Sequence, residues 1–180
     1  ETLVITGTNE SRIKINALIR QELKIESSVE MTALTRLDTT QATRRYSKYY
    51  TPDSTIIQPE KDYLRYGLER GKSYRVVEQS EGNTLIVEGE GGKRLTINPA
   101  HIKNLSVYKQ EQQQYGVGEK LVITRNNAEL DVANGDRFTI TGIQANHIYL
   151  SDGTKEIVLD INQKQHLDYA YVTTVHSAQG

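Results

Sequence analysis

The chain has 180 residues, of which 36% are hydrophobic and 25% charged, with 22 Lys and Arg against 23 Asp and Glu. The absence of cysteine excludes a disulfide framework and thiolate metal sites, and the four histidines stand too far apart in sequence to suggest a metal site. No stretch approaches the roughly 20 consecutive apolar residues of a membrane-spanning helix. The formal charge of −1 provides no overall basic surface for duplex DNA, so any contact with nucleic acid is expected to be local.

The N-terminal residues predict a strand–turn–helix unit. Residues 2–6 alternate like a β-strand and lack the basic and apolar regions of a signal peptide, so we expect a cytoplasmic protein. Gly7 interrupts the strand, and Thr8 or Asn9 can cap the following helix. The expected buried face of this helix consists of the apolar residues at helical spacing: Ile15, Leu18, Ile19 and Leu23.

The segment 30–54 is rich in threonine and other polar residues and predicts a connector, with one short helix over Gln41–Tyr50. Within it, cations alternate with aromatic rings, a mixture that suits the phosphates and bases of a single strand. The candidate DNA-binding residues of this cluster are Arg44, Arg45, Tyr46, Lys48 and Tyr49. The alternative is that cation–π contacts of the same residues anchor the connector on a neighbouring domain.

Three isolated arginines, Arg12, Arg20 and Arg125, are weaker candidates for DNA contact. Isolated arginines usually lie in solvent or pair with nearby acids, here such residues as Glu10 or Asp131. We therefore assign them no role in the candidate site.

From residue 62 onward, short alternating runs separated by turn residues predict two groups of antiparallel strands. The expected strands of the first group are 73–77, 84–88 and 93–98, with Leu95 and Ile97 inward. Those of the second group are 137–143, 147–151 and an alternating run through Ile157, Leu159 and Ile161.

The two groups of strands resemble each other in sequence. Residues 70–76 match 134–140 at a shift of 64, and residues 85–87 match 148–150 at a shift of 63, as a one-residue gap in the intervening turn would produce. We interpret them as two related small β-barrels of SH3-like size, because a few short strands need closure or a partner to cover their edges. The alternative is a chance likeness between two ordinary meanders.

The C-terminal run 167–175 is continuously apolar and β-branched, which is typical of a strand buried on both faces in a parallel sheet. We expect it to pair with the strand at 2–6. The two barrels would then be an insertion between two strands of one sheet.

Residues Val172–Gly180 resemble motif V of the RecD-like superfamily 1 helicases, whose pattern is Thr-x-His-(Lys or Ser)-x-Gln-Gly. Two further stretches are similar to the same family. The strand and helix that open its second motor domain are similar to Val4–Asn9 followed by Arg12, Asn16 and Arg20. The barrel inserted in that domain is similar to Gly118–Asn127 with Asn134–Asp136.

The long first barrel, at about 62–108, is similar to the extra 2B-like subdomain of TraI-type conjugative relaxase-helicases. This resemblance implies a mainly β fold with an α/β element, in which two small SH3-like β-barrels are inserted into a partial RecA-like α/β domain. The expected divisions are 1–54 (partial RecA-like strand–helix unit plus connector), 55–116 (first barrel, 2B-like), 117–166 (second barrel, 2B) and 167–180 (return strand and motif V).

The resemblance also implies DNA contacts in motif V. Thr173 and Thr174 would bond phosphate oxygens of a single strand, His176 would stack on or bond a base, and Gln179 would couple the nucleotide site to the DNA site. The alternative interpretation of these residues is a frayed chain end.

No phosphate-binding loop is present, because Gly89–Arg94 has glycines and a lysine but an arginine where the loop needs a hydroxyl. We therefore expect a non-catalytic fragment with no cofactor of its own, while the parent protein would be an ATP-dependent DNA helicase and relaxase that uses ATP and Mg²⁺.

The resemblance implies single-stranded DNA binding, a translocation signal for type IV secretion, or both, in plasmid DNA transfer. The alternatives are a pure protein-interaction module for the secretion or coupling apparatus, without DNA contact, and a degenerate helicase domain kept for structure. The expected partners are single-stranded DNA and type IV secretion or coupling proteins. A monomer without membrane insertion is expected in the bacterial cytoplasm, with export to a recipient cell by type IV secretion as a further expectation.

Overall fold

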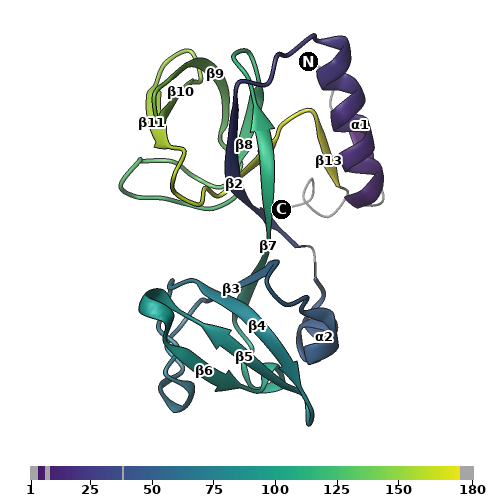
Figure 1. Cartoon of the computed structure of the whole chain (residues 1–180), viewed down its shortest axis with the longest axis vertical. Coiled ribbons are helices and arrows are strands. Elements are labelled where there is room, and N and C mark those ends of the chain that lie inside the picture. Colours follow the sequence, from purple (N-terminus) through teal and green to yellow (C-terminus); the bar gives the residue numbers. More distant parts are fainter. Residues whose placement is uncertain (1–3, 7–8, 38, 175–180) are drawn as a thin grey trace. The chain divides into compact units, whose positions relative to one another are not determined.

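The computed structural model describes residues 4–6, 9–37 and 39–174 (Figure 1). The chain divides into two compact units, one formed by Glu1–Thr35 with Glu111–Gly180 and the other by Arg36–Gln110. Both contain antiparallel sheets, which confirms the expectation of a mainly β fold. Among the described residues, no helix has the length and apolar character needed to cross a bilayer.

The unit Arg36–Gln110 is built on five antiparallel strands in the order β7-β3-β4-β5-β6, which we call the first meander. These strands are β3 (Thr55–Pro59), β4 (Tyr74–Ser80), β5 (Thr84–Glu88), β6 (Arg94–Ile97) and the first part of β7 (Leu105–Tyr115). The helical segments of the unit are α2 (Gln41–Arg44), η1 (Ser47–Tyr49), η2 (Leu64–Tyr66), η3 (Glu90–Gly92) and η4 (Pro99–His101). Alternate strand residues form its core, among them Tyr74, Val76, Leu85 and Val87.

The other unit contains a second set of five antiparallel strands in the order β12-β8-β9-β10-β11, which we call the second meander. These strands are β8 (Lys120–Ile123), β9 (Arg137–Gln144), β10 (His147–Ser151), β11 (Glu156–Asp160) and β12 (Leu167–Tyr169). Its core includes Leu121, Phe138, Ile140, Ile148 and Leu150. The strands predicted for both meanders from alternation are therefore confirmed, with ends shifted by a few residues.

The first part of the expected connector is a strand. Residues Val29–Arg36 form β2, which pairs with β7 and buries Met31 and Ala33 in the core of the second meander. The connector prediction was wrong here because the alternation of apolar and polar residues is weak in this segment. Pairing with β7 makes it a strand. The short helix expected over Gln41–Tyr50 is present as two pieces, α2 and η1. The connector after Arg36 belongs to the same compact unit as the first meander.

The two meanders repeat the same register. In the first, Tyr74 of β4 lies opposite Ile57 of β3, and in the second, Phe138 of β9 lies opposite Leu121 of β8. All four side chains are buried. Both pairs are related by the shift of 64 positions found in the sequence, so the predicted internal repeat is present in strand order and register.

A β-bulge also recurs at the same position. In the first meander, Val77 is the extra residue between Val76 and Glu78 in the pairing of β4 with β5. In the second, Thr141 is the extra residue in the pairing of β9 with β10. A bulge bends and twists a strand, and its recurrence gives the two meanders the same local distortion.

The N-terminal and C-terminal strands form a separate parallel pair. Strand β1 (Val4–Thr6) pairs with β13 (Val172–Thr174), with Val4 opposite Val172 and Thr6 opposite Thr174. This confirms the predicted pairing of the two ends of the chain for Val172–Thr174. The expected single strand over 167–175 was wrong, because Leu167–Tyr169 forms the separate strand β12, which pairs antiparallel with β8 in the second meander. Both meanders are inserted, in sequence, between the strands of this pair.

Helix α1 (Asn9–Glu22) buries only part of the face predicted for it, because Ile15 and Ile19 are half-buried. Leu18 is 61% exposed, and Leu23, just beyond the helix end, is 55% exposed, whereas Arg12 and Asn16 are buried. The prediction was wrong because α1 is held by ionic side chains, which make partners on the sheet, as well as by apolar contact. Helical spacing identifies a face but not the side chains that meet it.

Candidate functional site

Three residues of the predicted DNA-binding segment form a compact exposed cluster, which we call the Tyr–Lys cluster: Tyr46, Lys48 and Tyr49. The Lys48 ammonium lies 5.8 Å from the ring centroid of Tyr46 and 5.1 Å from that of Tyr49. The two tyrosines are 54% and 50% exposed. The cluster therefore presents two aromatic faces and one positive charge to solvent.

The side chain of Asn83 holds the backbone of the segment that carries the Tyr–Lys cluster. The side-chain amide of Asn83 donates to the carbonyl of Arg45 at 2.8 Å, and its carbonyl oxygen accepts from the backbone N–H of Ser47 at 2.7 Å. Asn83 sits in the turn between β4 and β5 with φ of 59°, a left-handed conformation that asparagine tolerates. The cluster is therefore fixed to the tip of a hairpin of the first meander.

The buried residue Tyr50, next to the cluster in the chain, anchors this segment. Tyr50 is 1% exposed, and its hydroxyl donates to the carbonyl of Arg44 at 2.6 Å. The amide of Gln79 donates to the carbonyl of Tyr50. Burial raises the pKa of the Tyr50 phenol well above its usual value, so the hydroxyl stays protonated and able to donate. Anchoring is thus performed by a buried ring and hydrogen bonds, which leaves the cation–π contacts of the cluster itself at the surface.

The two arginines of the predicted site differ in their surroundings. The guanidinium of Arg44 is part-buried and donates to the carbonyls of Leu105, at 2.6 Å, and Thr39, at 3.2 Å. Arg45 is exposed. The structure therefore leaves Arg45 exposed directly before the Tyr–Lys cluster in the chain, while Arg44 supports the fold of the unit. DNA contact by all five residues stays a prediction.

The motif V residues lie at the edge of what the structure describes. Thr173 and Thr174 belong to β13, where their backbones are opposite Ile5 and Thr6. Their side chains, and the whole of His176 and Gln179, lie outside the described residues. Their predicted contacts with DNA stay predictions.

An ionic network missed by the sequence analysis ties α1 to the second meander. Arg12 pairs with Asp168 of β12, and Arg20 donates to Glu119 at 2.9 Å. The hydroxyl of Tyr171 also donates to Glu119, at 2.9 Å. Burial raises the pKa of both carboxyls against the opposing effect of the arginines.

The sequence analysis did not identify Asp168 and Glu119 as partners of these arginines. Asp131, the acid proposed as a partner, instead pairs with Lys155 at 2.8 Å. Sequence separation hid the true pairs, since Arg12 and Asp168 are 156 positions apart. The network joins α1 to β12 and to Glu119, which also binds Tyr171 next to β13. Within the described part of the chain, no group of three His, Asp or Glu side chains is placed to hold a metal ion.

No protein-family model matches the chain. Over an alignment of 190 positions that covers the whole chain, it is 26% identical to the "Multifunctional conjugation protein TraI" of Escherichia coli strain K12 and 25% identical to a protein of the same name from Escherichia coli. The chain spans about a tenth of the length of these relatives. The similarity relates the chain to TraI conjugation proteins, as the motifs had indicated.

Proposed function

We propose that the chain is the DNA-gripping segment of a conjugative relaxase-helicase and that it binds single-stranded DNA through the Tyr–Lys cluster and Arg45. Similarity to TraI over the whole chain supports the relation to conjugation. The observation that carries the DNA contact is the position of the Lys48 ammonium between two half-exposed tyrosine rings.

The chemistry of this cluster suits a single strand rather than a duplex. Stacking of a base on an aromatic side chain contributes about 1–3 kcal/mol and needs a base face that is free of its neighbours. Lys48 and Arg45 supply charge for the intervening phosphates. Because the whole chain has a net charge of −1, long-range attraction of duplex DNA is weak and local stacking carries the affinity.

The proposal extends to the architecture of the parent protein. We assign α1 and the parallel pair β1–β13 to a RecA-like second motor domain and the two meanders to SH3-like barrels inserted in it. The parallel pairing and the repeated strand order support this assignment. In such a protein the DNA strand would be contacted by Thr173, Thr174, His176 and Gln179. ATP and Mg²⁺ would bind to other parts of the parent protein, so this chain would not be catalytic alone.

The test is a fluorescence-anisotropy titration of the chain with a labelled oligothymidylate of about 20 nucleotides. We expect the double variant Tyr46→Ala/Tyr49→Ala to bind at least about tenfold more weakly, because two stacking faces are lost. Leu64→Ala is the matched control, since Leu64 is an 89% exposed side chain of the same unit outside the cluster. Equal affinities of the three proteins would contradict the proposal.

A second function, recognition by the type IV secretion or coupling apparatus, is favoured by the surface around Leu64. This side chain projects from the η2 turn beside Tyr66, whose ring lies 5.7 Å from the guanidinium carbon of Arg65. The Tyr66 hydroxyl lies 2.5 Å from Nδ1 of His101. Here an exposed apolar side chain stands next to a tyrosine and an arginine, two residue types that are enriched at protein interfaces.

The two functions predict opposite effects for substitutions at Leu64 and at the two tyrosines. If the surface around Leu64 is a secretion signal, Leu64→Glu should reduce transfer of a fused recombinase reporter into recipient cells, while Tyr46→Ala/Tyr49→Ala should leave it unchanged. Sedimentation of the free chain should show a monomer that lacks affinity for lipid vesicles. Normal transfer by the Leu64 variant would remove this second candidate.

A further inference from the structure

A row of side chains on one face of each meander differs between the two repeats. In the first meander, cross-strand pairing places Tyr108, Ile56, Arg75 and Glu88 in one row. At the equivalent positions the second meander has Ala170, Lys120, Thr139 and Ser151. Three of the four replacements substitute a smaller side chain, and one replaces an apolar residue by a cation.

The row of the first meander is filled and internally paired. Tyr108 is 2% exposed, and Arg75 donates to Glu88 at 2.8 Å and to Asp53 at 2.7 Å. Glu88 also accepts from Arg94 at 3.2 Å. Its hydrogen bonds with Arg75 and Arg94 lower the pKa of Glu88, so the carboxylate remains ionised beside both cations. Each charge in this row therefore already has a partner.

The row of the second meander instead lines a pocket of about 440 Å³ on strands β8, β9 and β10. The loss of the tyrosine, arginine and glutamate side chains leaves this space open. Thr139, Thr141 and Ser151 line it. Thr141 is the residue of the β-bulge, and its hydroxyl donates to the carbonyl of Tyr149 at 3.3 Å, so Thr139 and Ser151 are the hydroxyl donors considered for a ligand. Thr141 stands two positions after Thr139 in β9, so strand alternation places both side chains on the same surface.

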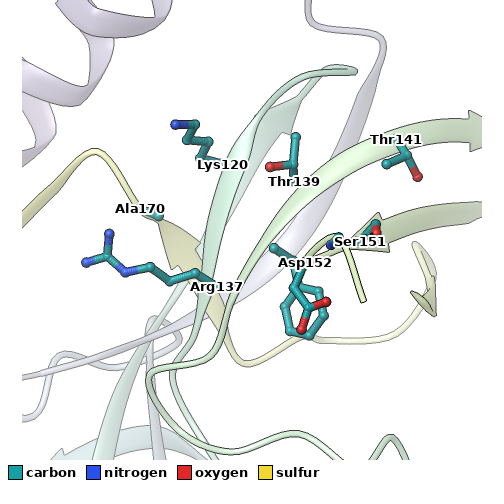
Figure 2. A pocket seen from close by; sticks show the side chains of 9 residues that line it. Lys120, Arg137, Thr139, Thr141, Ser151, Asp152 and Ala170 are labelled. Atoms are coloured by element: carbon teal, nitrogen blue, oxygen red, sulfur yellow. Dashed lines mark hydrogen bonds between the residues drawn. The ribbon is translucent and has the colours of Figure 1, made fainter. Parts of the chain in front are cut away.

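Two cations and one acid complete the lining of the pocket: Lys120, Arg137 and Asp152. In Figure 2 the side chains of Lys120 and Arg137 extend to the same side, away from the carboxylate of Asp152. That carboxylate accepts from the backbone N–H groups of Thr154 and Lys155, each at 2.7 Å, and these bonds lower its pKa. Part of the negative charge of Asp152 is thus already balanced by the turn that follows β10.

We propose that this pocket binds a phosphate group of the single-stranded DNA backbone. Hydroxyl donors combined with Lys and Arg are the side chains that most often contact DNA phosphates. The first meander supplies an internal comparison, since at the same positions it has a paired acid and bulkier side chains. The inference rests on the proposed DNA-binding function and adds a second contact point, on the other compact unit.

The experiment separates the pocket from the Tyr–Lys cluster by using two probes. An abasic oligomer of about 10 sugar-phosphate units offers phosphates without bases, whereas oligothymidylate offers both. Two variants address the pocket by different means: Lys120→Gln removes a charge, and Ala170→Tyr fills the space with the side chain that stands at the equivalent position of the first meander. Lys103→Gln, an exposed lysine in the other unit, is the charge-matched control.

We expect Lys120→Gln to reduce the dependence of log Kd on log salt concentration by about 0.7 for both probes, the value for one lost single-strand phosphate contact. Ala170→Tyr should weaken binding of both probes, and ¹⁵N spectra should show amide shifts at Thr139, Thr141 and Ser151 on addition of the abasic oligomer. A thermal melt monitors folding of the Ala170 variant, and Lys120→Gln replaces an exposed side chain with a shorter, neutral one.

The outcomes are distinguishable. If Lys120→Gln and Ala170→Tyr bind both probes like Lys103→Gln, the pocket proposal is overturned, whatever the result for Tyr46→Ala/Tyr49→Ala. If pyrophosphate shifts the pocket amides but the abasic oligomer does not, the site binds an anion other than DNA, and the proposal is again overturned. If only Tyr46→Ala/Tyr49→Ala binds like wild type, DNA binding by the Tyr–Lys cluster is contradicted, while the pocket proposal is supported.

Discussion

The two meanders share a backbone plan and differ in what one face carries. Both have five antiparallel strands in the same order, with the same bulge after equivalent buried residues. In the first meander that face is closed by Tyr108 and an Arg75–Glu88 pair, whereas in the second it is an open, hydroxyl-lined pocket. The comparison teaches that the shared core residues maintain the scaffold, while the row on the opposite face of the strands differs in its chemistry.

The largest expected effect separates the two units by their cores. Phe138→Ala removes a side chain that is 3% exposed in the second meander and should destabilise that unit by about 3–5 kcal/mol. Tyr74→Ala, at the equivalent position, should do the same to the first meander. Hydrogen exchange followed by mass spectrometry should show lost protection in 120–160 for the first variant and in 74–97 for the second. Equal loss in both units with either variant would show that they unfold as one.

The next prediction concerns pH. Burial, followed by the charge of Arg125, lowers the pKa of His166 from 6.5 to about 4. Because its folded pKa is below the unfolded one, His166 contributes stability above pH 6.5, and this stability is lost as the pH falls from 6.5 toward 4. The expected loss is about 2–3 kcal/mol across that window, confined to the unit that contains the second meander.

The pH prediction is measured as a difference between proteins, because the raised pKa values of Glu119 and Asp168 act in the opposite direction. Those carboxyls favour the folded state at low pH and lose that contribution as the pH rises through their folded pKa. Urea denaturation of wild type and His166→Gln at a series of pH values isolates the histidine. His147→Gln, at an exposed histidine of β10, is the control. Parallel stability curves for wild type and His166→Gln would contradict the prediction.

The smallest expected effect tests whether the paired row of the first meander matters for stability. Glu88→Ser introduces the residue found at the equivalent position of the second meander and leaves Arg75 with Asp53. Since this pair is solvent-accessible, we expect the Tm to fall by no more than roughly 3 °C. The difference should shrink further in about 1 M salt, where exposed charges are screened. A large, salt-insensitive loss would mean that the row supports the fold rather than a surface.

The residues of the candidate site were predictable from the sequence, but which of them are exposed and which support the fold was not. Alternating cations and tyrosines identified the segment that carries Tyr46, Lys48 and Tyr49, because the residue types alone state the chemistry. The inward role of Arg44 was hidden, since its acceptors include the carbonyl of Leu105, far away in sequence. The pocket had no signal in a single segment, because its lining comes from three strands and a bulge.

The sequence by itself determined the two meanders, their internal repeat and the pairing of the chain ends. Strand alternation, turn residues and a β-branched run are local properties, which survive without knowledge of the partners. The tertiary structure alone decided that Leu18 is exposed while Arg12 is buried beside Asp168, and that the same row of positions is closed in one meander and open in the other. The reason is physical: burial and ion pairing depend on which distant residues come into contact, and local periodicity does not specify them.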